Sequence, residues 1–457
     1  MIMDLRNKDA LVVGFGKTGA ALVRFLHRRG ARVSVTEKRA AGELGKSTAL
    51  WKDRGVRFET GGHTEAFIRE RDLILLSPGV PPHPAVAAAE RAGTPILSEI
   101  ELAGRFLRGT IVAVTGTNGK STTATLIHRI LTDAGRKSFL AGNIGTPLIS
   151  FVEASSTGHV YVIEISSFQL EYTERFRPDT AVFLNITENH IDWHGSFEAY
   201  FDAKKKLFSN MSARETAVLN RDDARVWAVR REGSFQTAAF SRKTRPTRGV
   251  FIHNGWIVLN DGGEKPLIPL SDIRLPGTHN HENVMAAVLT GHLLGVSPGR
   301  MKMTIRAFQG LEHRLENVLT FRGVRFINDS KATTVDAALK ALAAVEERVV
   351  LILGGRAKGG DFRPLRPAVR KKAARAVLVG EAAGALEDAL KGAAPLERAS
   401  SFRDAVRRAF AAAEPGQVVL LAPACTSWDM FRSFEERGRV FKNEVRKIAR
   451  ISERKKA

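Results

Sequence analysis

The sequence has very little cysteine: Cys425 is the only one among 457 residues. An intrachain disulfide is therefore excluded, and a reducing compartment is favoured. No apolar run approaches the roughly 18 residues that a membrane-spanning helix needs. Charges within the first nine residues do not fit a signal peptide, and long polar tracts and internal repeats are absent. We therefore expect a folded cytoplasmic protein without a membrane span.

Acidic residues are few relative to basic ones, with 48 Asp and Glu against 70 Lys and Arg, a formal net charge of +22. Such an excess is typical of nucleic-acid-binding proteins, and it also attracts small polyanionic substrates. The arginines are spread over every segment, and only residues 439–456 form a clear basic cluster. No basic patch is interleaved with aromatic residues for stacking on bases. We expect no nucleic-acid partner and interpret the cluster as a solvated helix face.

A chain of this length is too long for one ordinary hydrophobic core, so two or three domains are expected. Short apolar runs alternate with helical patterns through residues 1–98, which predicts a parallel α/β domain. Similar patterns predict a second α/β domain over residues 99–309 and a third over residues 310–457. Within the second, residues 236–275 carry turn residues between short alternating runs, which predicts a small antiparallel excursion.

The first glycine loop follows an apolar run at residues 10–13. Gly14, Gly16 and Gly19 have GxGxxG spacing, and Glu37 stands about 20 residues further on, as in a dinucleotide-binding fingerprint. A glycine turn at the start of a helix binds a diphosphate whatever group is attached to it. The loop therefore predicts a diphosphate ligand and leaves open whether that ligand is a redox cofactor.

A second glycine loop, TGTNGKSTT, joins a buried apolar run to a helical pattern. A phosphate-binding loop needs glycines that turn backbone N–H groups inward, a lysine for the phosphates and a hydroxyl for Mg²⁺. This loop has the shorter GTNGKS form, because position 114 is Val. The residues that we expect to bind ATP are Gly116, Thr117, Asn118, Gly119, Lys120, Ser121 and Thr122. A metal-binding acid is expected at the end of a neighbouring strand, and Glu164 in VYVIEISS is suitably placed.

Several further motifs follow one another in order: GNIG, EISSFQLE, NITENHIDWHGSFEAY, GTHNHENVMAA, GLEHRLE, NDSKAT and APACTSWDMFRSFEERG. With TGTNGKST they resemble the Mur ligases of bacterial cell-wall synthesis, and the resemblance runs from about residue 10 to residue 445. Among these ligases it is closest to those that add D-glutamate to UDP-N-acetylmuramoyl-L-alanine. The resemblance implies a Rossmann-like domain for the uridine nucleotide, a central P-loop ATPase and a C-terminal Rossmann-like domain for the amino acid.

The resemblance further implies an ATP-dependent amide-forming ligase that works through an acyl phosphate in peptidoglycan precursor synthesis. The implied catalytic residues are Lys120, Glu164, His190 and Lys204. The implied metal ligands are Ser121, Glu164, His190 and, if its amine is carbamylated, Lys204. Alignment leaves the position of that lysine open against Lys205 and Lys206. ATP and Mg²⁺ are the implied cofactors, with two metal ions expected and Mn²⁺ as a substitute, and we expect a monomer.

The substrate-binding residues are also assigned by resemblance. Asn280, Asn283, Arg314 and Asp329 are placed around ATP, with His313 beside Arg314. The uridine substrate is assigned Phe15, Lys17, Thr18, Glu37, Lys38, Arg39, Ser77, Pro78, Gly79, Asn143, Ser166 and Gln169. The D-glutamate pocket is assigned Lys331, Thr333, Lys358, Ser427, Trp428 and Phe434. Two positions depart from the family pattern, since Asn189 replaces an aspartate and Trp428 replaces a smaller apolar residue.

Three alternatives remain open from the sequence. Another amide ligase of the same superfamily, such as an alanine- or diamino-acid-adding ligase or folylpolyglutamate synthase, would share the class, although the APACTSWDMF segment speaks against it. An NAD-dependent oxidoreductase would rest on residues 10–37 and leave the second loop, Glu164 and the third domain without a role. A nucleic-acid-dependent ATPase would rest on the net charge alone.

Overall fold

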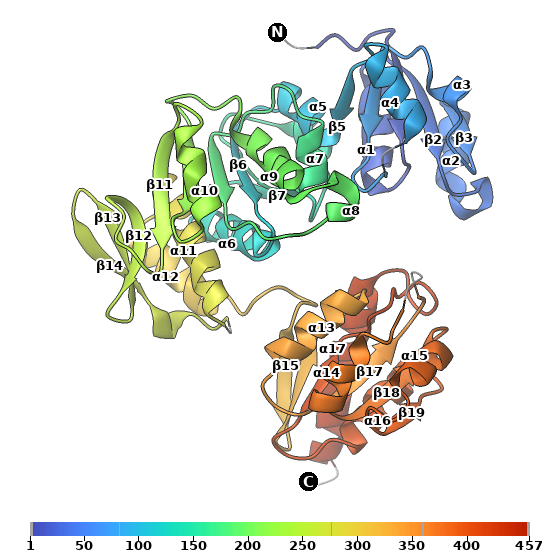
Figure 1. The fold of residues 1–457 in the computed structure, drawn as a ribbon, viewed down its shortest axis with the longest axis vertical. Coiled ribbons are helices and arrows are strands. Elements are labelled where there is room, and N and C mark those ends of the chain that lie inside the picture. Colours follow the sequence, from blue (N-terminus) through green and yellow to red (C-terminus); the bar gives the residue numbers. More distant parts are fainter. Residues whose placement is uncertain (1–2, 82, 276, 358–360, 455–457) are drawn as a thin grey trace. The chain divides into compact units, whose positions relative to one another are not determined.

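The structure is a computed structural model that describes residues 3–81, 83–275, 277–357 and 361–454 (Figure 1). The chain forms two compact units, Met1–Phe308 and Gln309–Ala457. Two β-sheets lie in the first unit and one in the second, and each is covered by helices. This confirms the predicted α/β fold class. Among the helices of these described ranges, none is long and apolar enough to cross a membrane.

The first sheet has five parallel strands in the order β3-β2-β1-β4-β5. The strands are β1 (Asp9–Val13), β2 (Arg32–Glu37), β3 (Arg57–Thr60), β4 (Leu73–Leu76) and β5 (Ile96–Ser98). Its helices are α1 (Lys17–Arg28), α2 (Lys46–Lys52), α3 (Glu65–Ile68) and α4 (Pro84–Arg91). The strand order reverses between β1 and β4, and in open parallel sheets ligands bind at the carboxyl ends beside such a reversal. The glycine turn after β1 and residues 77–79 after β4 flank this point.

The second sheet has nine strands in the order β14-β13-β12-β11-β10-β9-β6-β8-β7. The strands are β6 (Thr110–Thr115), β7 (Ser138–Gly142), β8 (Val160–Glu164), β9 (Thr180–Phe183), β10 (Thr216–Asn220), β11 (Gln236–Ser241), β12 (Arg248–His253), β13 (Trp256–Asp261) and β14 (Glu264–Pro269). The predicted antiparallel excursion is formed by β12, β13 and β14, whereas β11 pairs in parallel with β10 and β12. The phosphate-loop strand β6 lies inside the parallel part, between β8 and β9.

Helices cover both faces of this sheet. The helices are α5 (Glu99–Phe106), α6 (Lys120–Asp133), α7 (Ser167–Glu171), α8 (Ile191–His194), α9 (Phe197–Lys205), α10 (Ala224–Ala228), α11 (Thr278–Leu293) and α12 (Pro298–Ala307). Apolar residues of α6, α11 and α12 share one core with Val112 and Val114 of β6. The other face packs on a core that continues into the first sheet and includes Leu22 and Phe25 of α1. The two sheets of the first unit are therefore joined by continuous apolar packing.

The third sheet has six strands in the order β15-β16-β20-β17-β18-β19. The strands are β15 (Glu316–Phe321), β16 (Val324–Asn328), β17 (Val349–Gly354), β18 (Ala373–Val379), β19 (Leu396–Arg398) and β20 (Val418–Leu421). Its helices are α13 (Val335–Ala344), α14 (Leu365–Lys372), α15 (Ala383–Leu390), α16 (Phe402–Ala411) and α17 (Phe434–Arg454). Only β15 pairs antiparallel, and the carboxyl ends of β16, β20 and β17 lie side by side.

Helix α5 buries two carboxylates where the first two sheets meet. Glu101 accepts hydrogen bonds from the backbone N–H groups of residues 174–176 and pairs with Arg105. Glu99 has no such cation, and its Oε1 accepts one hydrogen bond from Ile149 N at 2.6 Å. Burial raises the pKa of Glu99 to about 7, against the lowering effect of hydrogen bonds from Ile149 and Leu148. A carboxyl group with this pKa stays protonated in the folded state where the unfolded chain has already lost its proton.

The pKa of the Glu99 carboxyl is ordinarily 4.5 and is about 7 in the folded protein. Between these two pH values the folded protein binds the proton more tightly than the unfolded chain, so we expect the free energy of unfolding to fall as the pH rises. Glu99→Gln keeps an oxygen for Ile149 but cannot ionise, so this pH-dependent loss should shrink by up to roughly 3 kcal/mol. Urea unfolding at pH 4.5 and pH 7.5, followed by circular dichroism, measures the difference. Glu90→Gln changes an exposed carboxylate on α4 and should retain the wild-type pH dependence. An unchanged pH dependence in Glu99→Gln would contradict the prediction.

Candidate functional site

The second glycine loop connects β6 to α6 and packs against α11. Gly119 has φ +81°, and a Cβ atom there would lie 2.1 Å from Asn283 Oδ1. Asn283 Oδ1 also accepts a hydrogen bond from Thr123 Oγ1, and Asn283 Nδ2 donates to Asn280 Oδ1 at 2.9 Å. The structure thus brings the loop together with Asn280 and Asn283, which the sequence places more than 150 residues away. Glycine at position 119 is required by both the backbone angle and this close approach.

Two residues that the sequence analysis assigned no role brace the opposite side of the loop. Asn185 Oδ1 accepts a hydrogen bond from Asn118 N at 2.8 Å, and Asn185 Nδ2 donates to Asn118 O at 3.2 Å. The Tyr200 hydroxyl lies 3.1 Å from Thr117 Oγ1, which also bonds the backbone of Thr187. Asn185 comes directly after the apolar run of β9, so its position at a strand end was the available signal. Pairing of β9 with β6 was needed to connect it to the loop.

Two lysines converge on the loop. Lys120 Nζ donates to Gly116 O and Thr117 O, both at 2.9 Å. Lys204 Nζ donates to Gly116 O at 3.0 Å and to Thr115 Oγ1 at 3.3 Å, and it lies 4.8 Å from the centre of the Tyr200 ring. Burial, reinforced by the charge of Lys120, lowers the pKa of Lys204 well below its ordinary value, and the charge of Glu164 opposes this.

The neighbours of Lys204 in the KKK run lie elsewhere. Lys205 Nζ pairs with Asp202 and Glu232 at 3.0 and 3.1 Å. Lys206 is exposed and donates to Glu171 O. Of the three lysines, Lys204 is the one whose amine bonds the loop, which favours this position for the predicted carbamate.

Glu164 ends β8 beside the loop strand, in register with Val114 of β6. It is 2% exposed, and its Oε1 accepts a hydrogen bond from Asn143 Nδ2 at 2.7 Å. Its Oε2 is buried and has no hydrogen-bond partner. A buried carboxylate oxygen without a partner is costly, and a bound cation would satisfy it.

The residues around the loop fit Mg²⁺. Glu164 supplies a carboxylate oxygen and Ser121, buried at the start of α6, supplies a hydroxyl. Across the described ranges, no three His, Cys, Asp or Glu side chains gather closely enough to hold a metal. Mg²⁺ suits such a site, because it commonly takes one or two protein oxygens and completes its shell with phosphates and water. His190 lies at the start of α8 with φ +54°, exposed, and its ring contacts Phe168 at 4.7 Å between centres.

In the first sheet, Glu37 holds the glycine turn in place. Its Oε2 accepts from Phe15 N at 2.6 Å, and both its oxygens accept hydrogen bonds from Arg39. Burial alone would raise the pKa of Glu37, but the hydrogen bonds from Arg39 and Phe15 outweigh it and lower the pKa to about 2. Arg39 Nη2 also donates to Phe15 O, and Ser77 Oγ donates to Gly14 O. The predicted residues Phe15, Glu37, Arg39 and Ser77 are thus connected around one turn.

The same unit brings several other predicted residues together. Lys17 Nζ donates to Gly145 O at 2.5 Å, which links the first turn to the GNIG loop that carries Asn143. A cavity is lined by Ser77, Pro78 and Gly79 from the first sheet and by Gln169 and Phe168 from α7. Gln169 Oε1 accepts hydrogen bonds from the N–H and hydroxyl of Ser166. Thr18 lies half-buried in α1, and Lys38 is exposed beyond β2.

In the second unit, the predicted residues follow β16 and β20. Burial raises the pKa of Asp329 to about 6, although a hydrogen bond from Leu315 N and the charges of Arg314 and Lys331 oppose this. Lys331 Nζ lies 5.8 Å from the centre of the Phe434 ring. Thr333 N donates to Lys331 O in the same loop, and Ser427 is buried, whereas Trp428 is 63% exposed. Lys358 lies outside the described residues.

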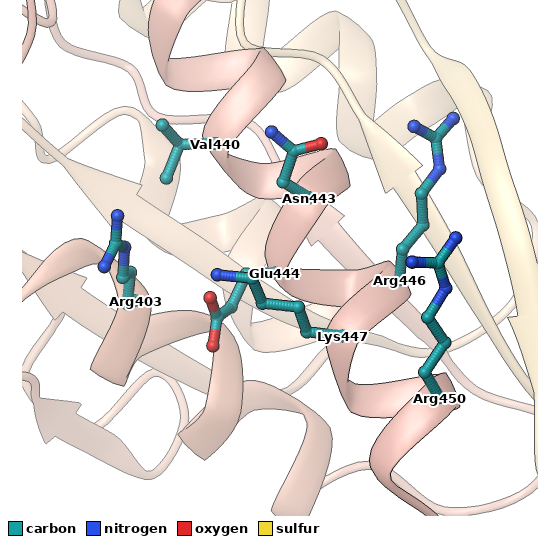
Figure 2. Close-up of a pocket in the computed structure, with 7 residues that line it drawn as sticks. All are labelled: Arg403, Val440, Asn443, Glu444, Arg446, Lys447 and Arg450. Atoms are coloured by element: carbon teal, nitrogen blue, oxygen red, sulfur yellow. The ribbon is translucent and has the colours of Figure 1, made fainter. Parts of the chain in front are cut away.

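The basic cluster near the C-terminus is only partly a solvated face. A cavity of about 300 Å³ lies beside this helix and contains none of the predicted site residues. Figure 2 shows its basic lining residues, Arg403 of α16 and Arg446, Lys447 and Arg450 of α17. Lys442, in contrast, is buried and pairs with Glu312 and Glu316, each at 2.8 Å. The interpretation as a solvated face is wrong for Lys442, because the strand and loop facing α17 supply acidic partners.

Comparison with known proteins covers all three sheets. The sequence matches the models of the "Mur ligase MurD-like, N-terminal domain" over residues 8–98, the "Mur ligase middle domain" over 114–291 and the "Mur ligase, glutamate ligase domain" over 313–425. It is 43% identical over 449 residues to the UDP-N-acetylmuramoylalanine–D-glutamate ligase of Koribacter versatilis, covering 98% of this chain and 99% of the relative. The Acidobacterium capsulatum ligase of the same name is 45% identical over 447 residues, or 97% of each chain.

A solved structure supports the fold. The UDP-N-acetylmuramate–alanine ligase of Thermotoga maritima aligns with a TM-score of 0.58 and 17% identity, covering 96% of this chain and 99% of that one.

Replacing Glu164 by Gln removes a buried charge that has one partnerless oxygen. We expect Glu164→Gln to raise the unfolding temperature of the ligand-free protein by a few degrees, since functional sites commonly sacrifice stability in this way. Differential scanning calorimetry without Mg²⁺ or nucleotide measures the effect. The exposed Glu90→Gln should leave the unfolding temperature unchanged. A lower unfolding temperature for Glu164→Gln would show that the protein itself already stabilises this carboxylate.

Proposed function

The chain belongs to the Mur ligase family, and we propose that it joins D-glutamate to UDP-N-acetylmuramoyl-L-alanine with ATP, in peptidoglycan precursor synthesis. The observation that carries the site assignment is the arrangement at the second glycine loop. Glu164, a buried carboxylate, has one oxygen without a partner there, and the buried Lys204 bonds the loop backbone. A glycine loop at the start of a helix is typical of phosphate-binding sites. We place the reaction in the cytoplasm and expect the protein to act as a monomer.

Amide formation requires an activated carboxyl group. The carboxylate of the uridine substrate attacks the γ-phosphorus of ATP, giving an acyl phosphate and ADP. The amine of D-glutamate then attacks the acyl carbon, loses a proton and expels phosphate. Because the first step joins two anions, it needs positive charge and fixed in-line geometry.

Residues of the loop supply these requirements. The N–H groups of residues 119–121, at the start of α6, would cradle the phosphates, and Lys120 would turn from the carbonyls of Gly116 and Thr117 to the phosphate oxygens. Mg²⁺, when bound, supplies charge that offsets repulsion between the phosphates and the attacking carboxylate. Ser121 and Glu164 would hold one ion and His190 would contribute to a second. Asn143 connects Glu164 to the GNIG loop and so to the reacting end of the uridine substrate.

Lys204 is proposed to carry a carbamate. Its lowered pKa increases the share of the neutral amine, and a neutral amine can attack CO₂. A C–N bond forms, a proton leaves, and the product is a carbamate anion that can serve as a metal ligand. The neighbouring charge of Lys120 would stabilise that anion.

The first sheet is proposed to bind the uridine diphosphate. Phe15, Lys17 and Thr18 lie at its glycine turn, residues 37–39 follow β2, and Ser77, Pro78 and Gly79 follow β4. A dinucleotide site would need Glu37 to accept a ribose hydroxyl, but its oxygens already accept from Phe15 and Arg39. This occupancy of Glu37 speaks against NAD, and the match of residues 8–98 to the MurD-like N-terminal domain supports the uridine substrate, with Glu37 acting by holding the turn. Ser166 and Gln169 are proposed to contact the same substrate from α7.

The second unit is proposed to bind the amino acid. Two carboxylates need a cation and fixed donors, and Lys331, Thr333, Ser427 and Phe434 lie on loops that can provide them. Lys358 and Trp428 are assigned to the same pocket. Arg314 and Asp329 are proposed to contact ATP.

The substrate assignment is tested by phosphate release with UDP-N-acetylmuramoyl-L-alanine, ATP and Mg²⁺ while the amino acid is varied. We expect D-glutamate to stimulate release strongly and L-glutamate, L-alanine and meso-diaminopimelate to have little effect. Lys120→Ala should abolish release because it removes the charge on the phosphates. Stimulation by L-alanine or meso-diaminopimelate, without D-glutamate, would assign the protein to another ligase of the family.

The carbamate is tested by chemical rescue. Lys204→Ala should lose nearly all activity and regain part of it when acetate or propionate is added, since a small carboxylate can occupy the vacated space. Lys206→Ala removes an exposed lysine of the same run and should remain active without rescue. Full activity of Lys204→Ala, or a loss that no carboxylate restores in a folded protein, would contradict the proposal.

A further inference from the structure

Arg437, in the first turns of α17, is the largest fully buried side chain of the described residues. Its guanidinium donates to five oxygens. Nε bonds Ser330 Oγ at 3.0 Å, and Nη2 bonds Ser330 O at 2.9 Å. Both Nη atoms bond Cys425 O at 3.1 Å, and Nη1 also reaches Thr426 O at 3.2 Å and Gly354 O at 3.4 Å. The five N–H donors of an arginine are therefore matched by five acceptors.

These acceptors come from three separate loops. Ser330 follows β16, Gly354 ends β17, and Cys425 and Thr426 follow β20. The three strands are adjacent and parallel, so the loops lie at one carboxyl edge of the sheet, where α/β domains bind ligands. Arg437 is the only side chain described here that bonds all three loops.

Two of these loops lead directly into residues assigned to the amino-acid pocket. Ser330 precedes Lys331, and Thr426 precedes Ser427. Phe434 is on the same helix as Arg437, and its carbonyl accepts a hydrogen bond from Ser330 Oγ at 2.8 Å. A displacement of the guanidinium would therefore move Lys331, Ser427 and Phe434 relative to one another.

Stability alone does not account for this arginine. The guanidinium of Arg437 is buried and bonded by carbonyl and hydroxyl oxygens, and among the described residues Asp429 is the carboxylate whose charge acts on it, without a direct hydrogen bond. Burying an unpaired charge costs several kcal/mol, whereas an apolar side chain of similar volume would be cheaper. Ala424, next to Cys425, has φ +57°, an unfavourable angle for a residue with a Cβ. Both costs occur at the carboxyl edge of the third sheet. They indicate that the arrangement of the loops at this edge is maintained at the expense of stability.

We propose that Arg437 is a positioning residue for the amino-acid pocket, holding the three loops at the spacing that D-glutamate requires. The inference rests on the proposed function, because the pocket residues are assigned there. Lysine cannot replace Arg437, since its three donors on one atom cannot reach five acceptors spread over three loops.

The test measures steady-state kinetics of Arg437→Lys for each substrate in turn. We expect the KM for D-glutamate to rise roughly tenfold or more, because a small misplacement of binding groups is costly. The KM for UDP-N-acetylmuramoyl-L-alanine should stay within about twofold of wild type, since the residues assigned to it lie in the first unit and no loop that Arg437 bonds belongs to that unit. The KM for ATP should rise less than that for D-glutamate, because of the ATP-assigned residues only Asp329 lies beside a residue that Arg437 bonds. Formation of the acyl phosphate without amino acid, followed by trapping with hydroxylamine, should be retained. Arg446→Lys, an exposed change on the same helix, is the matched control.

Ser330→Ala is a milder second variant that remains informative if Arg437→Lys does not fold. It removes the acceptor of Nε and the bond to Phe434 O, and should raise the KM for D-glutamate by a smaller factor. An unchanged KM for D-glutamate in a folded variant would overturn the proposal. So would a uniform loss of activity with a lower unfolding temperature and unchanged KM values, which marks a purely structural arginine. If wild type uses another amino acid, the proposed function fails, and the same KM comparison with that amino acid still decides the role of Arg437.

Discussion

The carbonyl oxygen of Gly116 accepts hydrogen bonds from the side-chain nitrogens of two lysines, Lys120 and Lys204, while a buried oxygen of Glu164 accepts none. The protein without ligands therefore directs two lysine nitrogens at one carbonyl and leaves a carboxylate oxygen of Glu164 without a hydrogen-bond partner. This imbalance is maintained by the surrounding fold. Strand β6 lies between β8 and β9, which places Glu164 on one side of the loop and Asn185 on the other. Phosphate oxygens would accept hydrogen bonds from the lysines, and a divalent cation would bind the partnerless oxygen of Glu164.

The three sheets place their predicted ligand residues at carboxyl ends but fix them differently. At the first sheet, Glu37 and Arg39 neutralise one another and hold the turn, so that edge is complete without a ligand. At the second, the charges around the loop are incompletely matched. At the third, Arg437 is satisfied by neutral oxygens of three loops. The edge to which we assign the phosphoryl chemistry is thus the one with a carboxylate oxygen left unsatisfied, and the edges assigned to the other substrates are held by matched hydrogen bonds.

The sequence predicted those features that depend on local order along the chain. Glycine loops after apolar runs, the carboxylate that ends β8, the antiparallel strands β12–β14 and the three α/β sheets all follow from spacing and periodicity. It did not predict contacts that depend on which strands pair. Asn185 braces Asn118 because β9 lies beside β6, and Lys442 is buried because Glu312 and Glu316 face α17. Arg437 lies in the APACTSWDMFRSFEERG motif, yet its hydrogen-bond acceptors lie up to 107 residues away along the chain. Spacing along the sequence therefore could not connect it to them.

The position of Lys204, in contrast, could have been derived from helix geometry. Tyr200, Ala203 and Lys204 are the buried residues of α9, at the i, i+3 and i+4 positions of one face, whereas Lys205 and Lys206 turn away from it. The aromatic ring of Tyr200 lines the path of the lysine stem and also fixes Thr117 of the loop. Burial on this face favours the neutral amine of the lysine, and Glu164, whose charge opposes this, already accepts a hydrogen bond from Asn143. In the proposed mechanism, uptake of CO₂ changes Lys204 from a neutral amine to an anion facing Lys120 and Glu164. Two anions beside one lysine attract a divalent cation more strongly than one, so the modification and metal binding should stabilise each other.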